Sequence, residues 1–190
     1  YPGKDKITIH EDTDGDGNYD QHSTFLDQLN LATSFEFGPE GVYVLQPPYL
    51  LYYADKDHDD KPDGKPEVLL EGFGIEDTHA LVSSLTWGPD GWLYGSQGST
   101  VSSKIKIPGS DQPSIDRIGQ LMWRYHPTRK VYEVFAEGGG NLWSCEFDSK
   151  GRLFSGHNGS TPGSYYLPGA YYAKTFRKHG EFSNAHVYGH

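Results

Sequence analysis

The sequence repeats one short pattern three times, and this repeat constrains the fold more than any other feature. Each copy has an aromatic residue, a four-residue turn that ends in glycine, and a strand-like alternating segment. The copies are Phe37–Val44, Trp87–Tyr94 and Phe147–Phe154. A tight turn between two such segments is typical of a β-hairpin. Because each copy must form the same unit, the chain is predicted to be a repeat structure.

A second type of hairpin alternates with the first. Its three copies pair Lys6–His10 with Ser23–Leu26, Tyr49–Ala54 with Glu67–Glu71, and Leu121–His126 with Val131–Phe135. Two successive hairpins make a four-stranded antiparallel meander, and a meander repeated at roughly 50 to 60 residues is typical of a β-propeller. A single β-sandwich is the alternative, but a sandwich need not repeat internally.

We therefore predict an all-β fold, a partial β-propeller of about three blade-equivalents. The expected units are an outer half-blade at 1–29, a blade at 30–76, a blade at 77–140, and an inner half-blade plus tail at 141–190. Closed propellers typically have four to eight blades. We expect the ring to be completed by the remainder of a larger propeller or by another chain.

Composition agrees with this prediction. Aromatic residues make up 14% of the chain, which is too many for a disordered segment, and 24 Gly and 12 Pro are too many for a helix bundle. The net charge of −10 argues against a nucleic-acid or anionic-membrane partner. The single Cys145 excludes an intrachain disulfide, and no apolar run is long enough to span a bilayer. Without an initiator Met or signal sequence, the chain is interpreted as a processed or excised piece.

The loop at 12–20 has the spacing of a calcium-binding loop. Carboxylates stand at its positions 1, 3, 5 and 9, which are Asp12, Asp14, Asp16 and Asp20. Gly17 stands at position 6, where the chain must turn sharply, and Asn18 can offer its carbonyl at position 7. The usual Glu at position 12 is replaced by Ser23, so a distant ligand or water would complete the shell. The alternative is a solvated acidic turn.

The loop at 55–63 repeats this spacing. Its carboxylates at the same four positions are Asp55, Asp57, Asp59 and Asp63. Asp60 replaces the glycine at position 6, and Asp tolerates left-handed backbone angles better than most residues do. We expect the turn to survive at some cost. The third equivalent turn, at 127–130, has no acidic residue and is expected to bind no metal.

The turns of a meander alternate between the two ends of its strands. Both acidic loops follow third strands, so we expect them at the end opposite the inter-blade loops, with a structural rather than a catalytic role. The polar residues placed at the inter-blade end, and so the candidates for a binding or catalytic site, are Asp77, His79, Gln97, Arg117, His157 and Asn158. A neutral imidazole can act as a general base near pH 7. The alternative for either His is a hydrogen-bonded loop residue. The tyrosines of the tail could stack on a sugar or pack against outer strands.

Four segments, Glu11–Gly17, Asp77–His79, Trp87–Gln97 and Trp123–Pro127, together resemble one family. This is the membrane-bound dehydrogenase propeller family of planctomycetes and verrucomicrobia, which is similar to soluble quinoprotein glucose and sorbosone dehydrogenases. In the glucose dehydrogenase branch, a His before a Gly-Pro-Asp turn takes the sugar hydroxyl proton. The resemblance implies that His79 is that base.

The resemblance further implies that pyrroloquinoline quinone is the cofactor and that Gln97, Arg117 or Asn158 positions cofactor or substrate. The sequence thus leaves two functions open. One is a quinone-dependent sugar or polyol dehydrogenase. The other is a calcium-stabilised propeller that only binds carbohydrate or a partner protein. An acidic extracytoplasmic protein, periplasmic or secreted, fits both functions.

Overall fold

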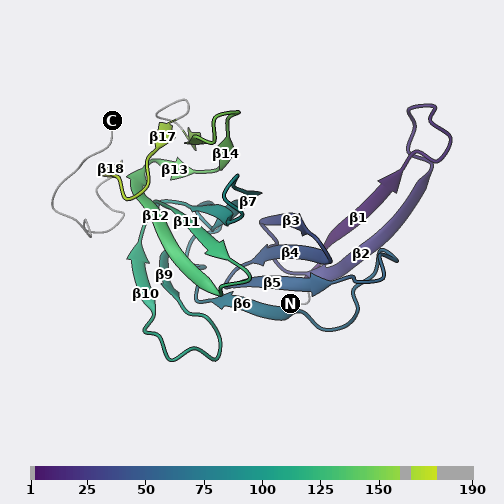
Figure 1. Cartoon of the computed structure of the whole chain (residues 1–190), viewed down its shortest axis with the longest axis horizontal. Helices are drawn as coiled ribbons and strands as arrows, with labels where there is room; N and C mark the ends of the chain where they lie inside the picture. Colours follow the sequence, from purple (N-terminus) through teal and green to yellow (C-terminus); the bar gives the residue numbers. More distant parts are fainter. Residues whose placement is uncertain (1–2, 159–163, 175–190) are drawn as a thin grey trace.

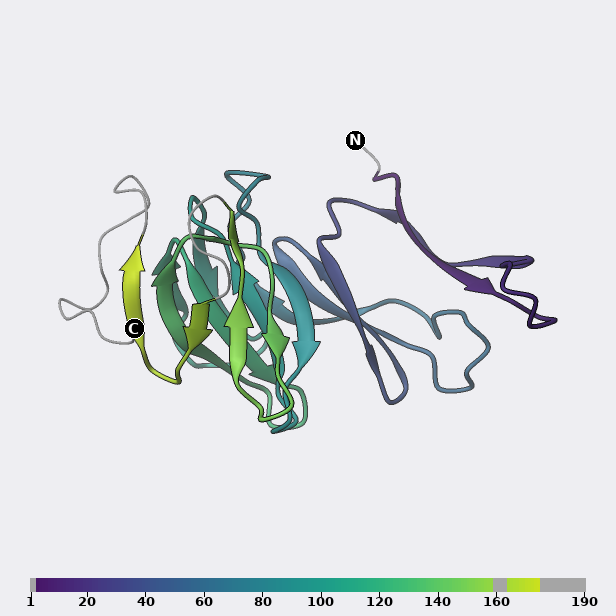
Figure 2. The same ribbon diagram turned by 90° about the horizontal axis from the view of Figure 1, so that it is seen from above.

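The computed structural model is built of strands and turns (Figure 1). It describes residues 3–158 and 164–174. Within these residues, no helix is long and apolar enough to cross a membrane. The predicted all-β fold is confirmed, and the sheets follow one another along the long axis of the molecule (Figure 2).

The N-terminal hairpin and the first blade form from the predicted segments. The hairpin joins β1 (Asp5–Glu11) to β2 (Gln21–Leu29) in antiparallel pairing. The first blade is a four-stranded antiparallel sheet made of β3 (Ser34–Gly38), β4 (Gly41–Gln46), β5 (Tyr49–Ala54) and β6 (Glu67–Glu71). Its strands lie in chain order, as a meander requires.

The second blade is also a meander, with one insertion. Its four strands are β7 (Ser83–Trp87), β8 (Leu93–Gln97), β11 (Leu121–His126) and β12 (Val131–Gly139). The segment between β8 and β11, for which the repeat predicts no strand, contains a separate hairpin of β9 (Ser102–Ile105) and β10 (Ile115–Ile118). Four-residue strands of alternating burial gave too short a pattern to be identified from sequence.

The C-terminal part contains the predicted inner half-blade and two additional strands. The strands are β13 (Asn141–Leu142), β14 (Glu146–Phe147), β15 (Leu153–Ser155), β16 (His157–Asn158), β17 (Ser164–Tyr166) and β18 (Tyr171–Lys174). β13 pairs with β16, and β14 pairs with β15. β17 adds a third strand beside β15, and β18 returns to lie parallel to β12.

The described tyrosines of the tail favour packing over sugar stacking. Tyr166 and Tyr171 are 1% and 2% exposed, and Tyr172 donates its hydroxyl proton to the carbonyl of Tyr165. Tyr188 lies outside the described residues.

The core lies between the sheets because strand residues alternate between two faces. In β4, Tyr43 and Leu45 pack toward the second blade, whereas Val42 and Val44 pack toward the β1–β2 hairpin. A third cluster joins the second blade to the C-terminal half-blade through residues such as Tyr94. The first and second blades are thus each packed against a neighbour on both faces, and the acidic loops and the inter-blade loops are left at the strand ends.

Candidate functional site

The loop between β1 and β2 lies at the tip of a hairpin that projects from the molecule (Figure 1). Asp12 organises this loop, because its carboxylate accepts backbone N–H groups of Gly15, Asp16 and Gly17 at 2.7, 3.2 and 2.8 Å. Gly17 has φ +88°, a left-handed angle that glycine adopts without a steric penalty. The sharp turn predicted at position 6 is therefore present.

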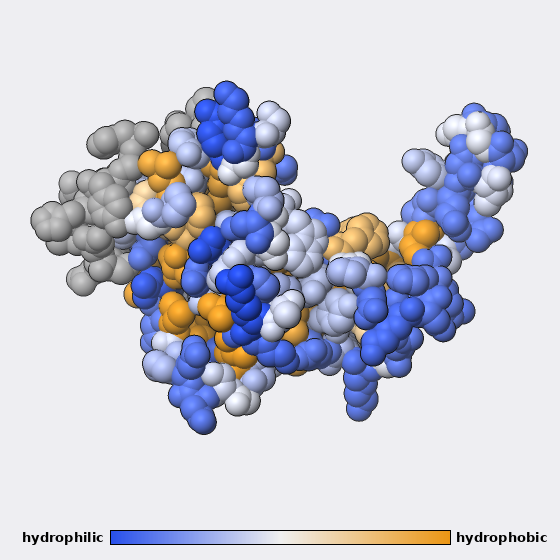
Figure 3. Space-filling view, in the orientation of Figure 1, coloured by the Kyte–Doolittle hydropathy of each residue, from blue (hydrophilic) through white to orange (hydrophobic). Residues whose placement is uncertain are grey.

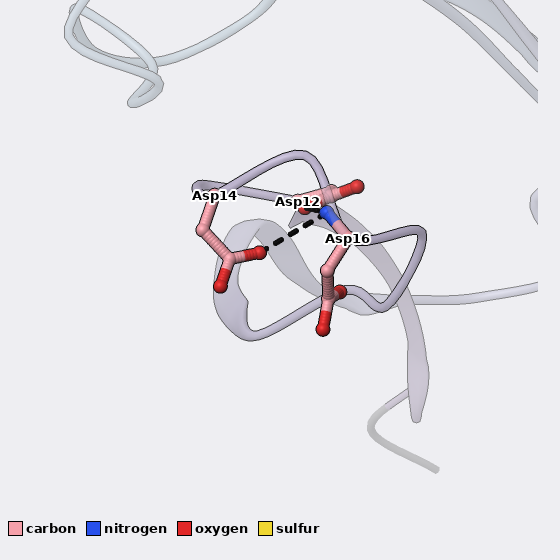
Figure 4. Close-up of side chains that lie close together, drawn as sticks. All are labelled: Asp12, Asp14 and Asp16. Atoms are coloured by element: carbon pink, nitrogen blue, oxygen red, sulfur yellow. Dashed lines mark hydrogen bonds between the residues drawn. The ribbon is translucent and has the colours of Figure 1, made fainter.

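Three carboxylates converge in this loop. Asp12, Asp14 and Asp16 each offer an oxygen, and these oxygens lie within 4.8 Å of one another (Figure 4). Calcium binds oxygens at about 2.3–2.6 Å, so two ligands on opposite sides of one ion are about 5 Å apart. The three oxygens are close enough together to share one calcium ion.

Hydrogen bonds favour the ionised forms of Asp12 and Asp16. The backbone N–H of Gly17 is the largest cause that lowers the pKa of Asp12 below its ordinary value of 3.8. The side-chain amide of Asn18 lowers the pKa of Asp16 in the same way. The loop is therefore an anionic oxygen cluster at neutral pH, which suits a hard cation.

The loop between β5 and β6 reproduces this geometry at equivalent positions. Position 5 donates its backbone N–H to the carboxylate of position 1 in both loops, from Asp16 to Asp12 at 3.2 Å and from Asp59 to Asp55 at 3.1 Å. Asp55, Asp57 and Asp59 also bring oxygens within 4.8 Å of one another. The two loops thus share one fold.

The backbone angles match as well. At position 4, Gly15 and His58 have φ +78° and +56°, and at position 6, Gly17 and Asp60 have φ +88° and +64°. The expectation that Asp60 would sustain the left-handed turn is confirmed. The shared angles show that this loop does not require glycine at either position.

The two loops differ in their surroundings. Asp55 is only 8% exposed, whereas Asp12 is half-buried. Lys61 Nζ lies 3.4 Å from Asp59 Oδ2, where it neutralises part of the second cluster. A cation in the second loop would therefore compete with a lysine that the first loop lacks.

The carboxylates at position 9 lie outside both clusters. Asp20 accepts the backbone N–H and the hydroxyl of Thr13 at 3.0 and 2.7 Å, and Asp63 accepts the backbone N–H of Lys56 at 3.0 Å. They close the loops, and they could reach a metal through water, as position 9 often does. Asn18 donates both its backbone N–H and its side-chain amide to Asp16.

The acidic loops and the inter-blade loop are separated by the length of a strand. β6 begins after the second acidic loop and ends before the loop that carries Asp77 and His79. Five residues of strand span roughly 17 Å. The topology therefore places the two candidate sites at opposite ends of the blade, as expected.

His79 lies open on the inter-blade loop, with its side chain 91% exposed. Its Nδ1 is 3.4 Å from Asp77 Oδ1, which also accepts the backbone N–H of His79 at 2.9 Å. The hydroxyl of Thr100 donates to Asp77 Oδ2 at 2.5 Å and is the largest cause that lowers the pKa of Asp77. The carboxylate is thus fixed from both sides and faces the imidazole.

Asn141 joins this loop to the C-terminal half-blade. Its side-chain amide donates to the carbonyl of His79 at 2.9 Å, and its oxygen accepts the backbone N–H of Ser99 at 3.0 Å. Thr100 and Ser99 were not identified as candidates from sequence, because Ser and Thr are common in loops and neither stands in a distinctive motif. Only their place after the second strand of the blade could have indicated them.

Gln97 and Arg117 bind partners other than His79. Gln97 is fully buried, donates to the carbonyl of Gly119 at 2.8 Å and accepts the hydroxyl of Ser103 at 2.6 Å. Arg117 pairs with Glu137, whose Oε1 lies 3.2 Å from Arg117 Nε. The backbones of His157 and Asn158 form β16, which pairs with β13 and so lies next to Asn141.

Comparisons with known proteins give a family match and distant structural matches. A family model described as "Domain of unknown function (DUF7133)" matches residues 1–188. None of the curated proteins matches the chain. A solved structure from Thermus thermophilus, described as a "putative oxidoreductase (glucose dehydrogenase)", is 13% identical and has a TM-score of 0.38. That match covers 97% of this chain and 72% of the other, and a likeness so distant carries no argument about function.

Proposed function

The chain belongs to the DUF7133 family, and we propose that it is a calcium-binding segment of a β-propeller in which the metal closes the outer hairpins of neighbouring blades. The observation that supports this function is the shared geometry of the two acidic loops. Each brings three carboxylate oxygens within 4.8 Å, and each uses the same left-handed positions. One acidic turn is a common surface feature, but two similar ones at equivalent blade positions favour a common ligand.

Calcium is the cation that fits these oxygens best. It takes six to eight oxygen ligands in flexible geometry, whereas Mg²⁺ demands a near-ideal octahedron. The chain carries a net charge of −10, so bound calcium would also reduce self-repulsion. A site with a Kd of about 0.1 mM would stabilise the fold by about 1.4 kcal/mol at about 1 mM calcium. A site of that affinity would be filled where calcium is about millimolar, as it is outside the cytoplasm, so we propose an extracytoplasmic location.

Thermal unfolding with and without calcium tests this function. For a chain of this size, about 1.4 kcal/mol corresponds to a rise in Tm of about 3–6 °C for each filled site. Asp14→Ala should remove part of the rise, and Asp27→Ala, at an exposed aspartate of β2 outside the loops, should leave it unchanged. Equal midpoints in calcium and in chelator would refute calcium binding.

A second candidate function is the quinone-dependent sugar or polyol dehydrogenase. The pair of His79 and Asp77 favours it, since Asp77 holds the Nδ1 side of an open imidazole and leaves Nε2 directed away from it. Nε2 would accept the hydroxyl proton of a substrate, and Asp77 would stabilise the imidazolium that forms.

The described residues fit the quinone cofactor poorly. Pyrroloquinoline quinone carries three carboxylates, which need cationic partners. Arg117 and Lys104 are already paired with Glu137 and Asp116, and within the described part of the chain no hydrogen bond or ion pair joins His79 to a Lys or Arg. The chemistry proposed for this chain is therefore limited to the proton transfer at His79.

Turnover by His79→Gln separates the two candidates. The assay would use the full-length protein with added quinone and a panel of aldoses. A lost general base costs about 10²- to 10⁴-fold in rate, and calcium stabilisation should remain because the acidic loops lie at the other strand ends. Equal turnover in both proteins, or none in either, would instead favour a non-catalytic propeller that binds carbohydrate or a partner protein.

A further inference from the structure

A largely apolar groove runs between the β1–β2 hairpin and the first blade, and its lining extends to Asp55, His58 and Asp60 of the second acidic loop. It has a volume of about 390 Å³, and Ile7, Ile9, Phe25, Phe35 and Phe37 contribute to its lining. Phe35 and Phe37 are 46% and 67% exposed and contact each other edge to face, with centroids 6.0 Å apart. Figure 3 shows an apolar patch at this place, beside the base of the hairpin.

The repeat supplies an internal comparison for these two residues. Phe35 corresponds to Leu85 and Cys145, which are 7% and 1% exposed. Each of the three stands on the first strand of its unit or directly before it. Within the described residues, Phe35 faces the two-stranded β1–β2 hairpin, whereas Leu85 and Cys145 each face a complete four-stranded meander.

The next residue on that face shows which element is missing. Phe37 corresponds to Trp87 and Phe147. Trp87 packs on Tyr43 of β4 with ring centroids 5.5 Å apart, and Phe147 packs on Tyr94 of β8 at 4.9 Å. In both cases, the partner comes from the second strand of the preceding blade. The corresponding partner of Phe37 would come from a second strand beside β1.

The edge of β1 indicates the same element. β1 is the third strand of its blade by the repeat, and its equivalents pair on both sides: β5 with β4 and β6, and β11 with β8 and β12. Within the described residues, β1 pairs with β2 alone. Its free edge therefore adjoins the apolar groove, and one added hairpin would satisfy both the edge and the exposed rings.

We propose that this groove and the free edge of β1 together receive an inner β-hairpin of the repeated type, supplied by a separate stretch of polypeptide, with an apolar side chain of its second strand on Phe37. The surface continues the existing interface, since Ile7, Ile9 and Phe25 already pack with Val42 and Val44. A second copy of this chain fits less well. In a second copy, the inner hairpin available at the other end is β14–β15. The edge of β15 that β1 would have to join already pairs with β17.

A fusion tests the proposal with the full chain. A second copy of residues 81–97, the inner hairpin of the second blade, is joined to the N-terminus through a short glycine–serine linker. The tether gives an effective concentration in the millimolar range. Amide hydrogen exchange is then compared between the fused and the unfused chain. We expect exchange at the edge amides of β1 to slow at least tenfold.

Variants make the result specific. Phe37→Asp in the fused chain should return exchange in β1 to the unfused rate, and its exposed ring is not needed for folding. Ile75→Asp, at an apolar residue 58% exposed outside the groove, should keep the protection. Equal exchange in fused and unfused chains would overturn the proposal. Protection of β1 in the unfused chain that rises with concentration, together with a dimer mass, would also overturn it and assign the groove to a second copy.

Discussion

Gly95→Ala is the substitution whose cost the structure defines most closely. Gly95 lies on β8 opposite Trp123 of β11, and a Cβ added there would meet Trp123 Cζ2 at 2.4 Å. Trp123 is fully buried, with Phe73 and Tyr132 at ring-centroid distances of 5.3 and 5.9 Å. The ring cannot yield, so the added methyl group overpacks the core between the blades.

Overpacking of this kind costs about 1–3 kcal/mol, which corresponds to a fall in Tm of about 2–12 °C for a chain of this size. Gly156→Ala is the matched control, because its added Cβ would meet Ser144 Oγ at 3.5 Å, an ordinary contact. Where the backbone angles suit any residue, alanine is favoured over glycine by about 0.4–1 kcal/mol. Calorimetry should therefore give a lowered Tm for Gly95→Ala and an unchanged or raised Tm for Gly156→Ala. A Tm for Gly95→Ala equal to that of Gly156→Ala would refute the packing of Trp123 on Gly95.

Four further predictions follow from named contacts. Asp60→Ala should lower stability by about 1 kcal/mol in urea unfolding, whereas Asp60→Gly should not, because φ is +64° there; equal effects would contradict the left-handed turn. Arg124→Lys should cost about 1–2 kcal/mol in the same measurement, because Arg124 Nε and Nη2 both donate to Glu133 Oε2, at 2.9 and 2.7 Å, and the guanidinium stacks 4.2 Å above Trp92; an unchanged midpoint would be inconsistent with that paired, stacked geometry. Burial raises the pKa of the Cys145 thiol, so a thiol reagent should modify it only as fast as the chain opens; rapid labelling of the folded protein would argue against its burial. The pKa values of Asp12, Asp16 and Asp20 are lowered in the folded loop, so their hydrogen bonds stabilise the loop fully above pH 3.8. This stabilisation should be lost as the pH falls through the lower pKa values of the folded state, and NMR of the loop amides can follow the loss. Loop signals lost well above pH 3.8 would show that the direction of the pKa shifts is wrong.

Local pattern was enough to predict the blades. The hairpins that begin at Phe37, Trp87 and Phe147 formed as β3–β4, β7–β8 and β14–β15, because alternation and turn residues act over a few neighbours. The acidic loops were predictable for the same reason, since their carboxylates organise their own backbone. The hairpin β9–β10 was missed, because its strands are short and are held by a bridge from Lys106 to Glu71.

Contacts between residues far apart in the sequence determine the features that could not be predicted from it. Gln97 is the last residue of β8 and was expected to face a ligand, yet it is buried and bonds to Ser103 of the inserted hairpin and to Gly119 directly after it. The parallel pairing of β18 with β12 forms only because the chain returns from the C-terminal half-blade to the second blade. Thr100 reaches Asp77 across 23 residues, a contact that no spacing rule indicates.

Calcium titration by calorimetry tests the central proposal most directly. The protein, stripped with chelator at neutral pH, should bind two calcium ions, one for each carboxylate cluster. Asp14→Ala and Asp57→Ala, at position 3 of each loop, should each remove one site, and the double variant should remove both. No saturable heat from the unmodified chain, or unchanged binding in the double variant, would contradict the proposal that the two loops bind calcium.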